Sequence, residues 1–212
     1  MKRSVLTIGI LLVLLGGAFW WLTNDNDRDG PGSADLLFHC AAGLRKPMSE
    51  IARQYEEEFG VKVNLQFGGS GALASQLELA GGDLYLPADQ SYIDSAREKG
   101  LMEEAIPVAL LTAGLVVPKG NPRGLTTLSD LGKEGLKISL AERSASVGRF
   151  TWKVLEEEGL LARVNPNVVV TKPTVNAIVE DVATGAVDVS LAWDAVAKNF
   201  SEVEWLAVPE VL

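Results

Sequence analysis

The segment Phe67–Ala74 has the residue types and the spacing of a ligand-binding turn. The alternating run Val61–Phe67 before it predicts a half-buried strand, and Leu73 and Leu77 after it recur at helical spacing. The glycines between strand and helix let the backbone approach a ligand, and Ser70 adds a hydroxyl beside the free N–H groups of the first helical turn. Such donors suit a negatively charged group. The alternative interpretation is that Ser70 only caps the helix and the glycines only turn the chain.

Three more junctions between a predicted strand and a predicted helix are equally short, small and uncharged. Their sequences are Ala41-Ala42-Gly43-Leu44, Ser144-Ala145-Ser146-Val147-Gly148 and Pro173-Thr174-Val175. In an open parallel sheet ligands bind outside the carboxyl ends of the strands, and several helix N-termini aimed at one point can hold an oxyanion with neutral N–H donors. Arg45, Lys46 and Arg149 flank two of the junctions, where they either add positive charge or are ordinary solvated surface residues.

The composition excludes several other kinds of site. The chain of 212 residues is 47% apolar, enough for one large or two small globular domains, and its net charge of −9 argues against a nucleic-acid partner. The only cysteine, Cys40, and the only histidine, His39, lie together in an apolar run, which predicts packed strand residues rather than a zinc site or a disulfide. Hydrolysis needs a nucleophile with a base, or paired carboxylates, and no such set is evident. We therefore expect neither an enzyme nor a cofactor.

The first 24 residues have the composition of a membrane segment. Lys2 and Arg3 precede an uncharged, strongly apolar run over residues 4–24, which is long enough to cross a bilayer. The basic residues before the run and Asp25 after it place the N-terminus in the cytoplasm and the remainder of the chain outside. An uncleaved anchor is favoured over a removed signal peptide, because no small-residue cleavage site follows the run. Residues 25–34, rich in Asp, Gly, Ser and Pro, predict a flexible tether.

Beyond the tether, strand and helix signals alternate with short loops, which predicts an α/β chain with mainly parallel sheets. The predicted strands are residues 36–40, 61–67, 83–86, 106–118, 136–141, 168–171 and 187–193. The predicted helices begin near residues 47, 72, 90, 147 and 175. The first of them carries an apolar stripe formed by Met48, Ile51, Ala52, Tyr55 and Phe59.

The order and content of these segments resemble the periplasmic molybdate-binding proteins of ABC importers, from about residue 36 to residue 208. The stretches that carry the resemblance are Ala41–Leu44, Gly68–Ala74, Gly82–Asp89, Val147–Phe150 and Trp193–Ala195. The resemblance implies an α/β periplasmic-binding-protein fold, with two lobes that are joined by a hinge and close on a tetrahedral oxyanion. It also implies that the oxyanion contacts fall on Gly43, Ser70, Val147, Val175 and Trp193, without a metal cation, and that Arg45 and Arg149 are the candidates for additional contacts.

Two of these positions depart from the family pattern. Gly43 stands where the molybdate binders have a serine, and Trp193 stands where they have a tyrosine. Both changes remove a hydroxyl donor, although the indole N–H of Trp193 offers a single donor in place of the phenol. The backbone N–H groups of Val147 and Val175 are unaffected. Molybdate, tungstate, another oxyanion and a small organic anion therefore all stay open as ligands.

The resemblance also implies an organisation and a function. Lobe I is expected over residues 35–112, lobe II over residues 113–195, and a return toward lobe I over residues 196–212, where the chain stops before further helical segments of the family. We expect a monomeric, extracytoplasmic solute-binding protein, anchored to the cytoplasmic membrane, that captures an oxyanion such as molybdate or tungstate for an ABC permease. The alternative is a membrane-tethered anion sensor or sequestering module without a transporter.

Overall fold

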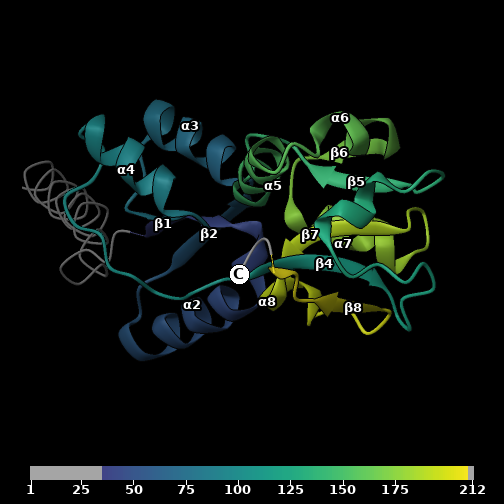
Figure 1. The fold of residues 1–212 in the computed structure, drawn as a ribbon. Coiled ribbons are helices and arrows are strands. Elements are labelled where there is room, and N and C mark those ends of the chain that lie inside the picture. Colours follow the sequence, from purple (N-terminus) through teal and green to yellow (C-terminus); the bar gives the residue numbers. More distant parts are fainter. Residues whose placement is uncertain (1–34, 210–212) are drawn as a thin grey trace, which may run out of the picture.

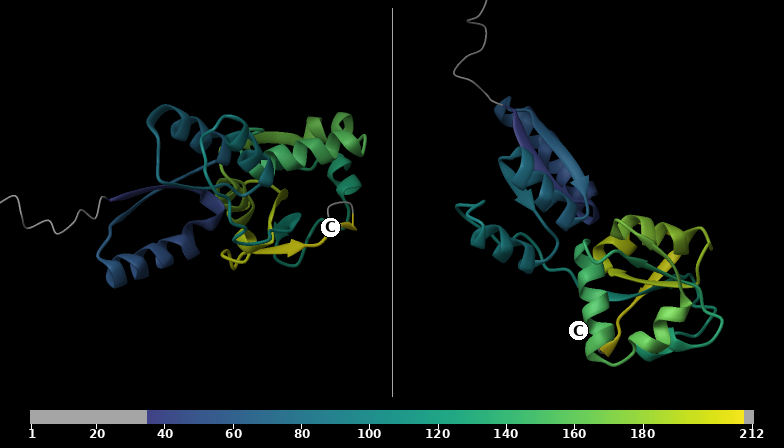
Figure 2. Two further views of the ribbon diagram at one scale, coloured as in Figure 1. Left: turned by 90° about the vertical axis from the view of Figure 1, so that its left-hand side faces the viewer. Right: turned by 90° about the horizontal axis from the view of Figure 1, so that it is seen from above.

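The computed structural model describes residues 35–209, so the predicted anchor at residues 1–24 and most of the predicted tether lie outside the described residues. Within residues 35–209, no helix is both long enough and apolar enough to cross a membrane. The described part of the chain forms two lobes that lie side by side (Figures 1 and 2). Each lobe is built on its own sheet.

Lobe I is built on a three-stranded parallel sheet, as the alternating pattern predicts. Its strands are β1 (Leu36–Ala41), β2 (Val63–Gly68) and β3 (Leu84–Leu86), in the order β2-β1-β3. Its helices are the 3₁₀ helix η2 (Ala42–Leu44), α2 (Arg45–Phe59), α3 (Ser70–Ala80) and α4 (Gln90–Glu98). Helix α2 lies on one face of the sheet and α3 on the other, with α4 beside α3 (Figure 1).

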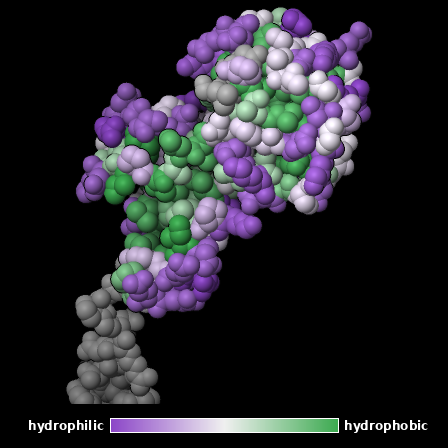
Figure 3. Space-filling view, turned by 60° about the horizontal axis from the view of Figure 1, so that its bottom comes forward, coloured by the Kyte–Doolittle hydropathy of each residue, from purple (hydrophilic) through white to green (hydrophobic). Residues whose placement is uncertain are grey.

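The apolar stripe of α2 is covered only in part. Met48 and Ala52 are buried, whereas Ile51, Tyr55 and Phe59 are exposed. A narrow sheet of three strands covers one side of the stripe and leaves its far edge open. Figure 3 shows the result, a gathering of hydrophobic residues on the surface of lobe I.

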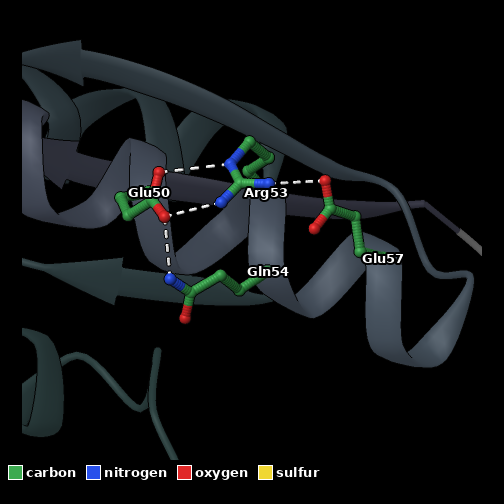
Figure 4. Close-up of polar contacts among 4 residues, drawn as sticks. All are labelled: Glu50, Arg53, Gln54 and Glu57. Carbon is green, nitrogen blue, oxygen red and sulfur yellow. Dashed lines mark hydrogen bonds and ion pairs between the residues drawn. The ribbon is translucent and has the colours of Figure 1, made fainter.

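The polar face of α2 is held by its own side chains. Arg53 donates to the carboxylates of Glu50 and Glu57, one turn before and one turn after it, and Gln54 also donates to Glu50 (Figure 4). The hydrogen bond from Arg53, followed by that from Gln54, lowers the pKa of Glu50 to about 2. These exposed contacts support the helix locally and lie on its solvent side.

Lobe II is built on a mixed five-stranded sheet, in the order β6-β5-β7-β4-β8. Strand β5 is parallel to both β6 and β7, and β4 is antiparallel to both β7 and β8. The strands are β4 (Ala113–Pro118), β5 (Ile138–Ala141), β6 (Val168–Lys172), β7 (Val189–Trp193) and β8 (Val203–Leu206). The helices are η3 (Leu128–Gly132), α5 (Ser146–Glu157), α6 (Leu161–Val164), η4 (Asn165–Asn167), α7 (Val175–Ala183) and α8 (Asp194–Ala197).

The chain moves from β5 to β6 in one direction along this sheet and from β6 to β7 in the other. Crossovers between parallel strands are right-handed as a rule, which places α5 and α7 against opposite faces of the sheet. The main hydrophobic core lies in lobe II and includes Leu115, Ile138, Leu140, Ile178 and Leu191, each of which is almost completely buried. Lobe II is therefore a rigid support for the loops at its strand ends.

Two segments differ from the sequence-based expectation. The strand predicted over residues 106–118 begins only at Ala113, because the preceding residues pair with no strand of the described chain, and Leu110 is 99% exposed. Residues 203–206, within the segment expected to return toward lobe I, form β8 on the edge of the lobe II sheet. Trp205 explains this placement, since its indole lies directly over Gly114 of β4, where no side chain stands in the way. The domain boundary between residues 112 and 113 stays a prediction.

Candidate functional site

The carboxyl ends of the parallel strands of both lobes meet around one small cavity. Its walls come from the residues that follow β1, β2 and β3 in lobe I and β5, β6 and β7 in lobe II. The lining residues are Ala41, Ala42, Gly43, Gly68, Gly69, Ser70, Ala88, Ala145, Ser146, Val147, Thr174, Val175 and Trp193. All five residues that the resemblance places at the ligand are among them, although they come from segments as distant as residues 43 and 193. Their role in binding stays a prediction.

The cavity is small in this arrangement of the lobes. Its volume is about 20 Å³. A cavity needs roughly 10–15 Å³ to hold one water molecule, so this cavity can hold one water molecule or little more. An anion with several oxygen atoms therefore requires the lobes to move apart before it can enter.

Ser70 forms the lobe I side of the cavity. It is the first residue of α3, its side chain caps nothing in the helix, and it is 2% exposed. Its hydroxyl oxygen accepts the N–H of Ala88 at 3.2 Å, and its carbonyl accepts the hydroxyl of Tyr85 at 2.8 Å. The interpretation of Ser70 as a simple helix cap is therefore wrong, because the cap position is Gly69 and no side chain caps α3.

The lobe II side is formed by the first turns of α5 and α7. Val147 is the second residue of α5 and Val175 is the first residue of α7, and both are buried. The N–H groups at these positions precede the first hydrogen bonds of their helices and donate to no acceptor among residues 35–209. The start of α5 is held against β5 by Trp152, whose indole N–H donates to the carbonyl of Ala141 at 2.9 Å. Both helices thus direct backbone donors at the cavity.

Gly43 and Trp193 complete the wall where the family has hydroxyl groups. A Cβ atom at Gly43 would lie 3.0 Å from Cγ2 of Val196 and 3.1 Å from Cγ1 of Val175, so neighbouring valines occupy much of the space that a serine would need. The ring of Trp193 lies 5.6 Å from that of Phe150 on α5, and Trp193 is 6% exposed. The wall is therefore more apolar than the family pattern implies.

The carbonyl group of Ser144 joins the two lobes beside the cavity. It accepts the N–H of Gly71 on α3 at 2.8 Å and the hydroxyl of Tyr92 on α4 at 2.8 Å. Burial raises the pKa of Tyr92 above its usual value, so its phenol stays protonated and remains a donor. The hydroxyl groups of Ser146 and Ser70 form a third contact between the lobes, at 2.6 Å.

Among residues 35–209, no charged side chain lines the cavity. Arg149 lies outside it, where it donates to the hydroxyl of Ser91 at 2.9 Å and covers the ring of Tyr92 at 4.1 Å. Arg45 is exposed and covers the ring of Phe67 at 4.0 Å. The structure thus does not bring the two candidate arginines to the cavity, and any anion held there would meet neutral hydroxyl and N–H donors.

The remaining residues of chemical interest lie away from the cavity. His39 and Cys40 are buried in β1, as expected, and His39 contacts the carbonyl of Gly81 through Nε2 at 2.9 Å. Burial raises the pKa of the Cys40 thiol to about 12, so it is an unreactive packed residue. Across residues 35–209, no group of His, Cys, Asp and Glu side chains is arranged to hold a metal ion.

Three features of the site were missed by reasoning from the sequence. Ser146 stands in one of the small-residue junctions but was not singled out there. The Ser144 carbonyl is a backbone group and leaves no signal in the sequence. Tyr92 lies on the predicted helix at residues 90–99, and its role depends on the approach of α4 to a loop of the other lobe, 52 positions along the chain.

Comparisons with known proteins identify the family of this chain. The family model of bacterial extracellular solute-binding proteins matches residues 36–212. A putative binding protein of Haemophilus influenzae is 26% identical over 185 residues, which cover 84% of this chain and 74% of that protein. The molybdate-binding protein ModA of Mycobacterium tuberculosis is 29% identical over 165 residues, which cover 76% of this chain and 62% of that protein.

Solved structures show the same fold. The periplasmic molybdate-binding protein of Azotobacter vinelandii superposes with a TM-score of 0.59 at 19% identity, and the match covers 75% of this chain and 71% of that one. At this identity the likeness establishes the fold alone. Since the family model spans nearly all of the described residues, the chain belongs to the bacterial extracellular solute-binding protein family.

Proposed function

We propose that this protein is an extracytoplasmic solute-binding protein that captures a tetrahedral oxyanion of the molybdate or tungstate type for an ABC importer. The observation that carries the proposal is the cavity between the lobes, where two serine hydroxyls and the first turns of α3, α5 and α7 converge and where the described part of the chain places no charged side chain. The mycobacterial relative, which is named a molybdate-binding protein, supports the choice of ligand.

The chemistry of the lining favours a fully ionised anion. N–H and hydroxyl groups at helix N-termini donate hydrogen bonds and carry partial positive charge, so they stabilise oxygen atoms that bear negative charge. An anion that carries a proton would present a donor to a wall with few acceptors. Discrimination among oxyanions then depends on size and on the number of donors that stay unpaired, each of which costs roughly 1–3 kcal/mol in a closed site.

The N-terminal run over residues 4–24 is proposed to anchor the protein at the outer face of the cytoplasmic membrane, where it would meet an ABC permease as a monomer. The family places the binding domain outside the cytoplasm. The alternative, a tethered anion sensor or sequestering module, uses the same cavity and differs only in its partner.

The test is a thermal-shift and calorimetric screen of the purified full-length chain in a mild detergent. Molybdate, tungstate, sulfate, phosphate and arsenate are added separately, and an anion that binds only the folded state raises the midpoint of unfolding by mass action. We expect the largest rise with molybdate or tungstate. No rise with any of the five anions would refute anion capture, and a rise without any binding to the permease from the same source would favour the sensor.

A further inference from the structure

Ser146 and Ser70 occupy equivalent places in the two lobes. Each is the first residue of a helix, α5 for Ser146 and α3 for Ser70, and both line the cavity. Ser146 is 4% exposed and Ser70 is 2% exposed, and their hydroxyl oxygens are 2.6 Å apart. Two helix N-termini therefore face each other through a pair of buried hydroxyl groups.

The hydrogen bonds of this pair leave one proton without a protein acceptor. A serine hydroxyl has one proton and two lone pairs. The Ser70 oxygen accepts the N–H of Ala88 and the O–H of Ser146, so both of its lone pairs are used and its own proton is free. If the hydroxyl–hydroxyl bond is reversed, the free proton belongs to Ser146 instead. In either direction, within the described chain, one hydroxyl proton is left to point into the cavity that both residues line.

The Ser146 hydroxyl is also not needed by its own helix. The cap position of α5 is Ala145, and no side chain caps the helix. The family's two other hydroxyl positions at the ligand are Gly43 and Trp193 here, so Ser146 and Thr174 are the hydroxyl residues that remain beside Ser70 in the lining. Thr174 caps its own helix by accepting the N–H of Ala177, whereas Ser146 is bonded to Ser70 across the cavity.

We propose that Ser146 is a specificity-determining residue of the anion site, and that it forms with Ser70 a hydroxyl pair which supplies the oxyanion with donors from both lobes. This inference depends on the proposed anion-binding function. With the pair intact, the anion receives one O–H donor that is polarised by the second hydroxyl. When an anion separates the lobes slightly, both hydroxyls are released and both can donate to it.

The experiment is a double-mutant cycle in the full-length chain with Ser70→Ala, Ser146→Ala and the two changes combined. Affinity for sodium molybdate and for sodium sulfate is measured by titration calorimetry. Ser144→Ala is the matched control, because it removes an exposed hydroxyl from the same loop and keeps the carbonyl that joins the lobes. Unfolding midpoints without anion confirm that each variant is folded.

We expect Ser146→Ala to weaken molybdate binding roughly three- to tenfold, the effect of one modest hydrogen bond. The double variant removes the last hydroxyl of the pair, so it should bind more weakly than Ser70→Ala alone, by roughly a further tenfold or more. Ser144→Ala should stay within about twofold of the wild type.

The outcomes separate this inference from the proposed function. If the wild type binds molybdate but Ser146→Ala binds it equally well, the role of Ser146 is refuted and the anion site stands. The same holds if the double variant is no weaker than Ser70→Ala, since Ser146 would then contribute no donor of its own. If the wild type binds neither anion, the proposed function fails and this inference fails with it.

Discussion

Replacing Gly71 by alanine should prevent the lobes from closing without unfolding either of them. A Cβ atom at this position would lie 2.6 Å from the carbonyl oxygen of Ser144, and ordinary contact begins only at 3.4 Å. The carbonyl belongs to the backbone of the opposite lobe and cannot rotate away as a side chain would. The φ angle of Gly71 is not positive, so alanine fits the helix itself and the strain falls on the contact between the lobes.

The magnitude follows from the contacts that depend on this approach. The bond from the Gly71 N–H to Ser144, the bond from Tyr92 to Ser144 and the bond between Ser146 and Ser70 all join the lobes at the same place. The anion itself releases the bond between Ser146 and Ser70, so only the two bonds to Ser144 count toward affinity. Each is worth about 0.5–1.5 kcal/mol net, and losing both costs the closed arrangement roughly 1–3 kcal/mol. Affinity for an anion on which the lobes close should fall by roughly fivefold to 150-fold.

The assay combines calorimetric titration of molybdate with a distance measurement between the lobes. Spin labels or dyes can be placed through Glu58→Cys on lobe I and Glu134→Cys on lobe II, both exposed positions. Cys40 should stay unlabelled, since it is 0% exposed and burial raises its pKa to about 12. Alanine at Gly71 should lengthen the distance and weaken binding, while the unfolding midpoint stays within a few degrees of the wild type.

Two further variants test whether the clash between the lobes is what weakens binding. Gly69→Ala should act like Gly71→Ala, because its Cβ would lie 2.7 Å from the carbonyl oxygen of Pro173 on lobe II. Gly132→Ala is the control, since its Cβ would contact only the side chain of Arg163, which can move. Wild-type affinity in both Gly69→Ala and Gly71→Ala would refute the view that the lobes close on the ligand through the backbone contacts at Pro173 and Ser144.

The other predictions concern selectivity, acid stability and topology. Combining Gly43→Ser with Trp193→Tyr should raise molybdate affinity relative to sulfate by up to about tenfold, provided that the side chains of Val175 and Val196 shift slightly to admit the new Cβ atom. Calorimetry that finds nanomolar wild-type binding of molybdate and no gain in the double variant would contradict this. The N–H of Thr126 and then Lys133 lower the pKa of Asp130, so Asp130→Asn should cost about 1 kcal/mol of unfolding free energy at pH 7. The pKa of Asp130 is lower in the folded chain than its unfolded value of about 3.9, so the stability difference between wild type and Asp130→Asn is fully present at pH values above the unfolded pKa. The difference is lost as the pH falls through the folded-state pKa, which urea titrations at several pH values can follow. The full-length chain should stay with membranes after a high-salt wash and keep its own N-terminus, whereas a soluble chain that starts near Asp25 would contradict the anchor.

Local patterns determined which segments became strands and helices. The alternating run before Ser70 formed β2, and the apolar runs before the other three junctions formed β1, β5 and β6. These patterns depend on neighbours in the chain, and helix or strand periodicity is visible wherever one face is buried. Residues 106–112 show the limit of this reasoning, because an apolar run becomes a strand only if another strand is available to pair with it.

The sequence also determined which residues could face an anion, since small residues at strand-to-helix junctions are recognisable from composition alone. Only the tertiary structure decided that Arg45 and Arg149 stay outside the cavity, that β8 joins lobe II, and that valines fill the space beside Gly43. The contacts of Ser146 with Ser70 and of Tyr92 with Ser144 likewise join residues more than 50 positions apart. Such contacts depend on how two separately folded lobes approach each other, and a backbone carbonyl or a packed valine acquires its role only from that approach.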